Sequence, residues 1–206
     1  MPKIVDPEER RRAVAEAVLR VVARDGLESA SLRNVAAEAG LVIGSVRHYF
    51  ADHTELLIFA MEELGRRIGR RIGARSEPLL ALAPGEDGRA LTENLFAELL
   101  PLDETRHRET VVWLAFTAAA RTRPELRPCA RRMHDGQRSL AAHVLTEARR
   151  AGSLPDGLDI ATESLRLSAL LDGLALQAVL QPDDVTPEAM RAVLRRHLAS
   201  LRAPRP

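Results

Sequence analysis

Apolar residues recur along most of the chain at intervals of three and four positions, which places them on one side of an α-helix. Proline and glycine clusters interrupt this pattern, notably at residues 82–88 and 152–157. No stretch stands out as alternating apolar and polar residues in the manner of a strand. The sequence therefore predicts an all-α protein of nine helices, with two short helices within 31–50 and the others at 7–24, 53–75, 89–100, 104–121, 124–151, 159–180 and 187–201.

The segment 31–50, SLRNVAAEAGLVIGSVRHYF, predicts two short helices joined by a tight turn. Apolar residues at helical spacing precede Gly40 at Leu32, Val35 and Ala36, and follow it at Val46, Tyr49 and Phe50. Gly40 stands where the first helix must end, because glycine adopts a positive φ without a steric penalty. This arrangement is typical of a helix-turn-helix, whose second helix lies in the DNA major groove.

The last two predicted helices carry more apolar residues than one buried face requires. Between Leu165 and Leu180, leucine and valine side chains occur on nearly every side of the helix, and the helix from Met190 to Leu201 adds a further apolar face. A helix that is apolar all round packs against neighbours on both sides. We therefore expect a homodimer in which these two helices of each subunit meet their copies across a two-fold axis.

Composition limits the class of protein. The 206 residues include one cysteine, Cys129, so an internal disulfide is excluded and a reducing compartment is expected. The first residues lack the apolar core of a signal peptide, and no apolar run reaches the roughly 18 residues that a membrane span needs. We expect a soluble cytoplasmic protein with no membrane partner. Because the formal net charge is only +1, a DNA-binding surface would have to concentrate its cations locally.

Residues 10–57 resemble the DNA-binding domain of TetR-type (tetracycline-repressor-like) transcriptional regulators. The resemblance is carried by an arginine-rich first helix followed by DGLESASLRNVAAEAGLVIGSVRHYFADHTELL. Later segments, VVWLAFTAAARTRPELR and LLDGLALQAVL, are similar to the C-terminal ligand-binding domain of a large bacterial subgroup. The resemblance implies a homodimeric repressor that a small-molecule effector releases from double-stranded operator DNA. It also implies a DNA-binding domain at residues 1–52 and a ligand-binding and dimerisation domain at 53–206.

The predicted DNA contacts lie on the recognition helix and at the starts of its two neighbouring helices. Small residues let the recognition helix approach base edges, and an arginine can contact guanine or phosphate with two hydrogen bonds. The residues concerned are Gly44, Ser45, Arg47, His48 and Tyr49 on that helix, Ser31 and Arg33 on the preceding helix, and His53 and Thr54 on the following one. Structural alternatives remain open: tight packing for Gly44, a solvated charge for Arg47, and a core position for Tyr49. The run Arg10–Arg12 could reach phosphate or form a solvated helix face.

Three positions depart from the family's usual pattern. Many members have Ser or Thr where Val42 stands, and valine cannot accept the hydrogen bond that caps the recognition helix. Many have Tyr where Arg47 stands, and Lys where His53 stands. A histidine is neutral for much of the time near pH 7, so contacts at this position are expected to differ from those of lysine.

A small-molecule pocket is predicted within the C-terminal domain. Such sites are mostly apolar with a few polar groups. The candidate residues are Phe96, Trp113, Phe116 and Met133 as apolar groups, with His107, Asp172 and Gln177 as polar ones. Ordinary core packing is the alternative for each aromatic residue. Asp172 stands out because an unpaired buried carboxylate is costly, so it could pair across a dimer, bind a cationic group of a ligand, or be exposed.

Two other kinds of protein fit the sequence less well. An enzyme or metal protein would have to use scattered residues such as His48, Asp52 and His53, which lie across a helix end in poor geometry for a metal. No HExxH, CxxC or glycine-rich phosphate loop is present, so we expect no catalytic residues, no metal and no cofactor. A helical scaffold that binds only protein would leave Arg47 and the small residues of the recognition helix without a purpose.

Overall fold

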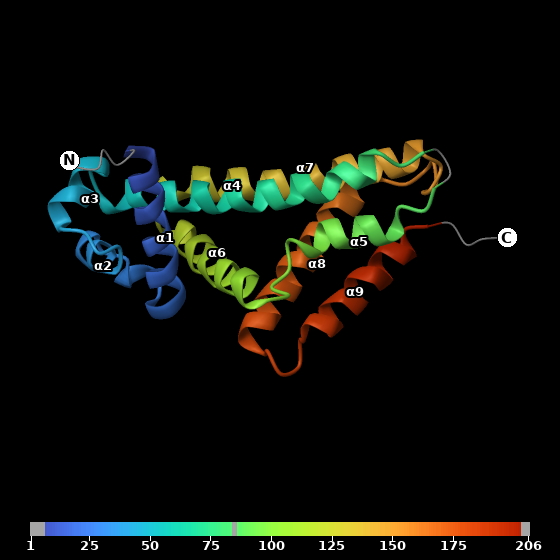
Figure 1. Cartoon of the computed structure of the whole chain (residues 1–206). Coiled ribbons are helices and arrows are strands. Elements are labelled where there is room, and N and C mark those ends of the chain that lie inside the picture. Colours follow the sequence, from blue (N-terminus) through green and yellow to red (C-terminus); the bar gives the residue numbers. More distant parts are fainter. Residues whose placement is uncertain (1–6, 84–85, 203–206) are drawn as a thin grey trace. The chain divides into compact units, whose positions relative to one another are not determined.

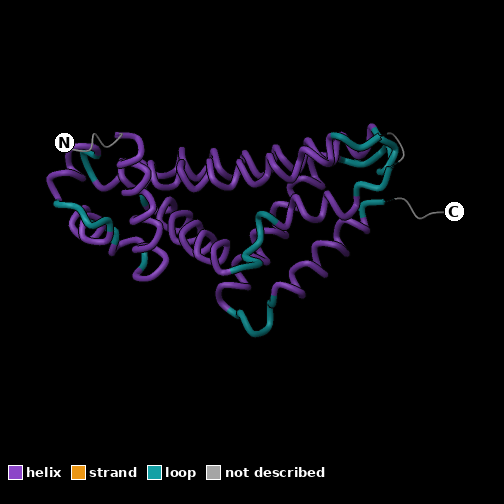
Figure 2. Tube along the Cα trace, in the orientation of Figure 1, coloured by secondary structure: helices purple, strands orange, loops and turns teal. Residues whose placement is uncertain are grey.

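The computed structural model describes residues 7–83 and 86–202, and within these ranges its elements are helices joined by loops and turns, without a strand (Figures 1 and 2). The prediction of an all-α fold with nine α-helices is confirmed within this part of the chain. In order, the elements are α1 (Pro7–Asp25), η1 (Leu27–Ser29), α2 (Leu32–Glu38), α3 (Ile43–Tyr49), α4 (His53–Leu80), α5 (Arg89–Ala97), α6 (Glu104–Thr122), η2 (Pro124–Leu126), α7 (Arg127–Arg150), α8 (Ile160–Leu180) and α9 (Pro187–Ser200), where η marks a 3₁₀ turn.

Three helices differ in extent from the prediction. α5 ends at Ala97, three residues before the predicted end at 100. α4 continues past residue 75 to Leu80 and contains Pro78. The proline lies in the last turn, where the loss of its N–H removes a single backbone hydrogen bond and ends the helix soon afterwards. The helix expected at 124–151 is a 3₁₀ turn, η2, followed by α7. Pro128, in the first turn of α7, occupies a position where proline is well tolerated.

The chain forms two compact units. The first comprises residues up to Arg67 together with Arg108–Arg131, and the second comprises Ile68–His107 together with the residues from Arg132 onward. α4, α6 and α7 each contribute to both units. The division into residues 1–52 and 53–206 that the sequence suggested stays a prediction.

The first unit packs α1 against α2, and α2 against α3. α1 turns a continuous apolar stripe inward, with Val14, Val18 and Val21 buried at helical spacing. On its surface, the guanidinium groups of Arg20 and Arg24 donate to the Glu38 carboxylate at the end of α2, at 2.6 and 3.1 Å. These contacts hold the base of the helix-turn-helix in place.

The second unit has its own apolar core between α5, α7, α8 and α9. Its buried residues include Leu95 and Phe96 of α5, Leu171 of α8 and Leu194 of α9. Side chains define the starts of the last two helices. The Asp159 carboxylate accepts from two backbone N–H groups at the start of α8, and the Thr186 hydroxyl accepts from the Ala189 N–H at the start of α9.

None of the described helices is long and apolar enough to cross a membrane. The described residues also contain no group of three or more His, Cys, Asp or Glu side chains arranged to hold a metal ion. Cys129, in α7, is buried and forms no disulfide.

Candidate nucleic-acid interface and effector domain

The turn between α2 and α3 is fixed by backbone geometry at Gly40. Its φ of 66° lies in the left-handed region, as the sequence indicated. The Gly40 N–H donates to the Ala37 carbonyl at 3.1 Å, and the Leu41 N–H donates to the Ala36 carbonyl at 2.8 Å. This pair of bonds is a Schellman motif, which closes the end of α2 and redirects the chain into α3. At the other end of α2, the Ser31 hydroxyl accepts the Asn34 N–H at 3.2 Å.

One side of α3 is buried against the first unit, and the other side is exposed. Val46 and Phe50 are fully buried and anchor it to the first unit. Gly44, Arg47 and His48 are exposed, whereas Ser45 and Tyr49 are half-buried. The recognition helix therefore presents a surface of small and polar residues, supported by two apolar anchors.

The start of α3 differs from that of α2. Its N-cap residue is Val42, whose side chain makes no capping hydrogen bond and is 73% exposed. The absence of a side-chain cap follows from the residue type, as the sequence predicted. The Ser45 N–H donates to the Val42 carbonyl at 2.9 Å. The N–H groups of Ile43 and Gly44 are therefore left to water or to an incoming acceptor such as a DNA phosphate.

A shallow hollow of about 420 Å³ lies over the start of α3. It gathers four of the residues predicted to contact DNA and adds two more. The predicted ones are Gly44, Ser45, His48 and Tyr49, and the others are Arg10 of α1 and Val42. The rings of His48 and Tyr49 meet edge to face, with centroids 5.1 Å apart. The sequence analysis noted Val42 only because it cannot cap the recognition helix. An apolar residue at a capping position also indicates that the side chain could contact another molecule.

The remaining predicted DNA contacts lie at the starts of α2 and α4. Arg33 is exposed, while the Ser31 hydroxyl is engaged in capping α2. At α4, the Asp52 carboxylate accepts the Glu55 N–H at 2.8 Å, and the Glu55 carboxylate accepts the Ala51 N–H at 2.7 Å. This arrangement resembles a capping box, except that the Glu55 carboxylate binds the N–H of the residue before the N-cap. His53 and Thr54 are half-buried beside these two carboxylates.

The three neighbouring arginines of α1 have separate surroundings. Arg10 lines the hollow over α3, and Arg12 is exposed. The guanidinium of Arg11 instead lies over the rings of Phe59 and Phe50, at 4.5 and 5.3 Å from their centroids. Only Arg11 is thus used in packing.

The residues predicted to bind a small ligand have several different environments. Phe96 is fully buried in the core of the second unit, and Phe116 is fully buried in the first. His107, Trp113 and Met133 are half-buried, and Gln177 is exposed. Their membership of one pocket stays a prediction.

Asp172 has polar neighbours within the second unit. Its carboxylate accepts from the Gln137 side-chain amide at 3.2 Å and lies 3.9 Å from Nδ1 of His134. The same Gln137 amide nitrogen lies 3.3 Å from the Ser168 carbonyl, to which it also donates. Asp172 is half-buried, so solvent can reach the polar cluster that it forms with Gln137 and His134 of α7.

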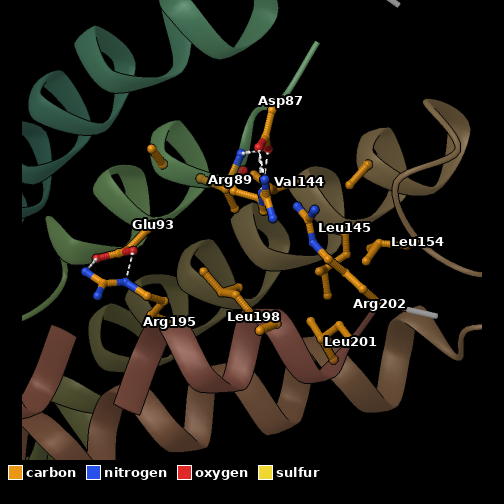
Figure 3. Close-up of a pocket in the computed structure, with 14 residues that line it drawn as sticks. Asp87, Arg89, Glu93, Val144, Leu145, Leu154, Arg195, Leu198, Leu201 and Arg202 are labelled. Atoms are coloured by element: carbon orange, nitrogen blue, oxygen red, sulfur yellow. Dashed lines mark hydrogen bonds and ion pairs between the residues drawn. The ribbon is translucent and has the colours of Figure 1, made fainter. Parts of the chain in front are cut away.

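The second unit also contains a cavity of about 490 Å³, drawn in Figure 3. It is formed by the beginning of α5 and the C-terminal ends of α7 and α9, together with Leu154. None of the seven predicted ligand residues lines it.

Comparison with known proteins decides the family. Residues 88–203 match the model of the BetI-type transcriptional repressor C-terminal domain. The HTH-type transcriptional regulator PksA of Bacillus subtilis is 37% identical over 201 residues, which cover 98% of this chain and 94% of PksA. This chain belongs to the TetR family of transcriptional regulators. The resemblance found in residues 10–57 is thereby confirmed, and this TetR-family protein is a regulator rather than an enzyme.

Solved structures share the fold of this regulator. A transcriptional regulator from Rhodococcus sp. Rha1 superposes with a TM-score of 0.79 at 31% identity, covering 93% of this chain and 95% of the other. A regulator from Saccharomonospora viridis, solved in complex with choline, superposes with a TM-score of 0.82 at 23% identity, covering 96% and 100%. TetR-family regulators bind operator DNA and small effectors.

Proposed function

We propose that this regulator represses transcription by binding a palindromic operator as a homodimer, and that a small effector bound in its C-terminal domain releases it. The observation that carries the proposal is the surface of α3. The helix is anchored by Val46 and Phe50 and directs Gly44, Arg47 and His48 outward. Such a surface has no packing role within its own unit.

Each exposed residue of α3 suits a particular contact in the major groove. Gly44 lets the helix backbone approach the base edges, since no side chain intervenes. Arg47 can donate two parallel hydrogen bonds to guanine or to a phosphate. Ser45 and His48 line the same hollow and supply shorter polar contacts, and Val42 supplies an apolar surface that fits a thymine methyl group.

Phosphate contacts are assigned mainly to three arginines of the first unit. Arg10 lines it, and Arg33 and Arg47 are exposed on α2 and α3. At the start of α4, Asp52 and Glu55 already bind backbone N–H groups, so their negative charge reduces the attraction of that terminus for phosphate. We therefore assign His53 and Thr54 a secondary role there.

The dimer is inferred from apolar side chains that a single chain leaves in water. On α8, Leu165, Leu176 and Leu180 are 53, 45 and 68% exposed, and on α9 Val193 is 40% exposed. The opposite side of α8 is buried in the core of the second unit through Leu167, Leu171 and Leu174. Both sides of this helix are thus apolar, and a second copy is the occupant that a two-fold operator requires.

The effector is proposed to bind in the C-terminal domain. The choline complex of the S. viridis regulator supports a small-molecule site in this fold. For this chain we propose Phe96, His107, Trp113, Phe116, Met133, Asp172 and Gln177 as the residues to test first. Asp172, with Gln137 and His134 as neighbours, is the group proposed to orient a polar or cationic part of the ligand.

Selection from genomic DNA tests the proposed function. Purified protein is mixed with fragmented DNA of the source genome, and the retained fragments are sequenced. The proposal predicts a small set of palindromic sites, bound by the wild type and lost in Arg47→Ala. Equal retention of all fragments would favour a helical scaffold that does not read DNA. Palindromic sites that are unaffected by Arg47→Ala would show that residues other than Arg47 read the operator.

A further inference from the structure

The cavity in the second unit is a second candidate binding site, separate from the residues proposed for the effector. Figure 3 shows side chains from α5, α7 and α9 converging on it. Its volume of about 490 Å³ falls within the roughly 300–1,000 Å³ typical of small-molecule sites. All of its lining residues belong to the second unit, so the cavity is formed within that unit alone.

Small side chains on three helices leave the space open. Each helix contributes one alanine to the lining, Ala90 from α5, Ala148 from α7 and Ala199 from α9. A methyl group at these positions does not fill the volume that a leucine would occupy, whereas protein interiors are otherwise closely packed. The cavity therefore follows from the residue types on these helices.

The interior of the cavity is apolar. Val144 and Leu145 of α7 line it, together with Leu198 of α9. Leu154, from the loop after α7, belongs to the same small core cluster as Leu145 and Leu201. A hydrocarbon chain would be favoured here because its binding removes both its own surface and that of the leucines from water.

The charged side chains of the lining already have partners within the protein. Nε of Arg89 donates to the two oxygens of Asp87 at 2.8 and 2.6 Å. Arg195 donates to Glu93 through two nitrogens at 2.9 and 3.0 Å. Arg202, the third arginine of the lining, also interacts with another group of the protein. None of the three guanidinium groups is thus waiting for a counter-ion.

Both carboxylates keep their charge at neutral pH. The hydrogen bond from Arg89 lowers the pKa of Asp87 to about 2, and the charge of Arg202 acts in the same direction. The hydrogen bond from Arg195 likewise lowers the pKa of Glu93. Protonation therefore does not break either ion pair near pH 7.

We propose that this cavity binds an uncharged amphipathic molecule, a medium-length hydrocarbon chain that ends in one hydroxyl group. The chain would lie against the leucines, and its hydroxyl would lie near Thr92 of the lining, whose own hydroxyl can both donate and accept. A carboxylate ligand would have to compete with Asp87 or Glu93 for an arginine. A cationic ligand would have to displace an arginine from its carboxylate, whereas an uncharged ligand leaves both ion pairs intact.

Binding at this cavity is independent of the proposed repressor function. None of the residues proposed to contact DNA or the effector lines it. Binding is therefore measured without an operator, and its failure would leave the proposal for DNA recognition untouched.

Calorimetry with three ligands of equal chain length tests the proposal on the whole chain. Octan-1-ol is the probe, and octanoate and octyltrimethylammonium are its anionic and cationic counterparts. The wild type is expected to bind octan-1-ol saturably and to bind each ion about tenfold or more weakly, because an ion loses hydration at the rim without gaining a free counter-ion. No saturable binding of octan-1-ol, or equal binding of either ion, would overturn the proposal.

Tryptophan variants locate the binding. Ala148→Trp fills the cavity and is expected to abolish octan-1-ol binding, whereas His143→Trp, at an exposed position of the same helix outside the lining, is expected to leave it unchanged. If Ala148→Trp does not fold, Ala199→Trp, at an exposed position of the lining, takes its place. Unchanged octan-1-ol affinity in a folded variant of the lining would contradict the site.

A further substitution tests the role of the ion pairs. Glu93→Gln removes a carboxylate and leaves Arg195 without its anionic partner. Octanoate is expected to bind this variant about twofold to fivefold more tightly than it binds the wild type, whereas the affinity for octan-1-ol is unchanged. Octanoate affinity that stays at the wild-type value would contradict ion pairing as the source of the selectivity.

Discussion

Two surfaces of this regulator are exposed in the single chain, and they differ in how well water solvates their side chains when no partner is bound. The surface of α3 consists of Gly44, Arg47 and His48, whose polar groups are fully hydrated when DNA is absent. The surface of α8 and α9 exposes Leu165, Leu176, Leu180 and Val193, for which water offers no compensation. The comparison indicates a reversible partner for the first surface and a lasting partner for the second.

The two surfaces should also respond differently to salt. Burial of a leucine side chain contributes about 1.5–3 kcal/mol and depends little on ionic strength. Contacts to phosphate gain affinity from released counterions, so DNA affinity falls steeply as salt rises. Dimerisation and DNA binding can therefore be separated by conditions as well as by mutation.

The largest effect is expected from a charge placed in the apolar surface. Leu176→Glu should dissociate the dimer, because a carboxylate would be desolvated at the interface, and a cost of about 2–4 kcal/mol is typical of a central interface residue. Sedimentation equilibrium measures the dissociation constant. Ala118→Glu, at an exposed position of α6 in the other unit, is the control for an added negative charge. A Leu176→Glu protein that remains as dimeric as the wild type would place the interface elsewhere.

A smaller effect is expected from the recognition helix. Arg47→Ala should weaken operator binding by about 1–3 kcal/mol, which corresponds to roughly fivefold to 150-fold, while dimerisation is unchanged. Fluorescence anisotropy with labelled operator provides the affinity. Arg138→Ala, an exposed arginine of α7, serves as the control for loss of one positive charge. Equal losses in both variants would show that Arg47 contributes only general charge.

The missing side-chain cap at the start of α3 is expected to lower the free energy of unfolding. Val42→Ser supplies the missing cap and should raise the free energy of unfolding by about 0.5–1 kcal/mol, measured by urea denaturation. Ser31→Ala removes the cap of α2 and should lower it by about the same amount.

The side chain at position 42 should also determine whether the protein distinguishes thymine from uracil. Wild-type protein should bind less tightly to an operator in which uracil replaces the contacted thymine, because the methyl group is lost. Val42→Ser should not distinguish the two bases. Insensitivity of the wild type to every thymine-to-uracil replacement would contradict an apolar contact by Val42.

The smallest expected effect is the contribution of His197, near the end of α9, to the pH dependence of stability. Burial, and the nearby charge of Arg166, lower the pKa of His197 below its usual value near 6.5. The unfolded chain then binds the proton more readily, so the stability from this group is complete above about pH 6.5 and falls as pH decreases toward the folded pKa. Urea midpoints between pH 7.5 and 5.5 should fall less in His197→Gln than in wild type. His143→Gln, at an exposed position, should retain the wild-type slope.

Local patterns were enough to predict most of the fold. Helical spacing placed each α-helix to within a few residues, and Gly40 marked the turn because only its φ permits the Schellman geometry. The hydrogen bonds by which Asp52 and Glu55 fix the start of α4 were not predicted. They depend on which side chain reaches the backbone, which spacing alone does not determine.

The sites depend on contacts between residues far apart in sequence, and there the sequence was less informative. The hollow over α3 includes Arg10, which lies more than thirty positions before Val42. The cavity in the second unit joins Asp87 to Arg202, and no local motif marks either residue. The polar neighbours of Asp172 likewise come from another helix, α7.

Mass measurement of the protein across a salt series, with and without its operator, tests the central comparison most directly. The account predicts a dimer at both low and high salt, two subunits per palindrome at low salt, and release of an intact dimer from DNA as salt rises. Dissociation of the free protein into monomers at high salt, with DNA binding unaffected, would contradict it.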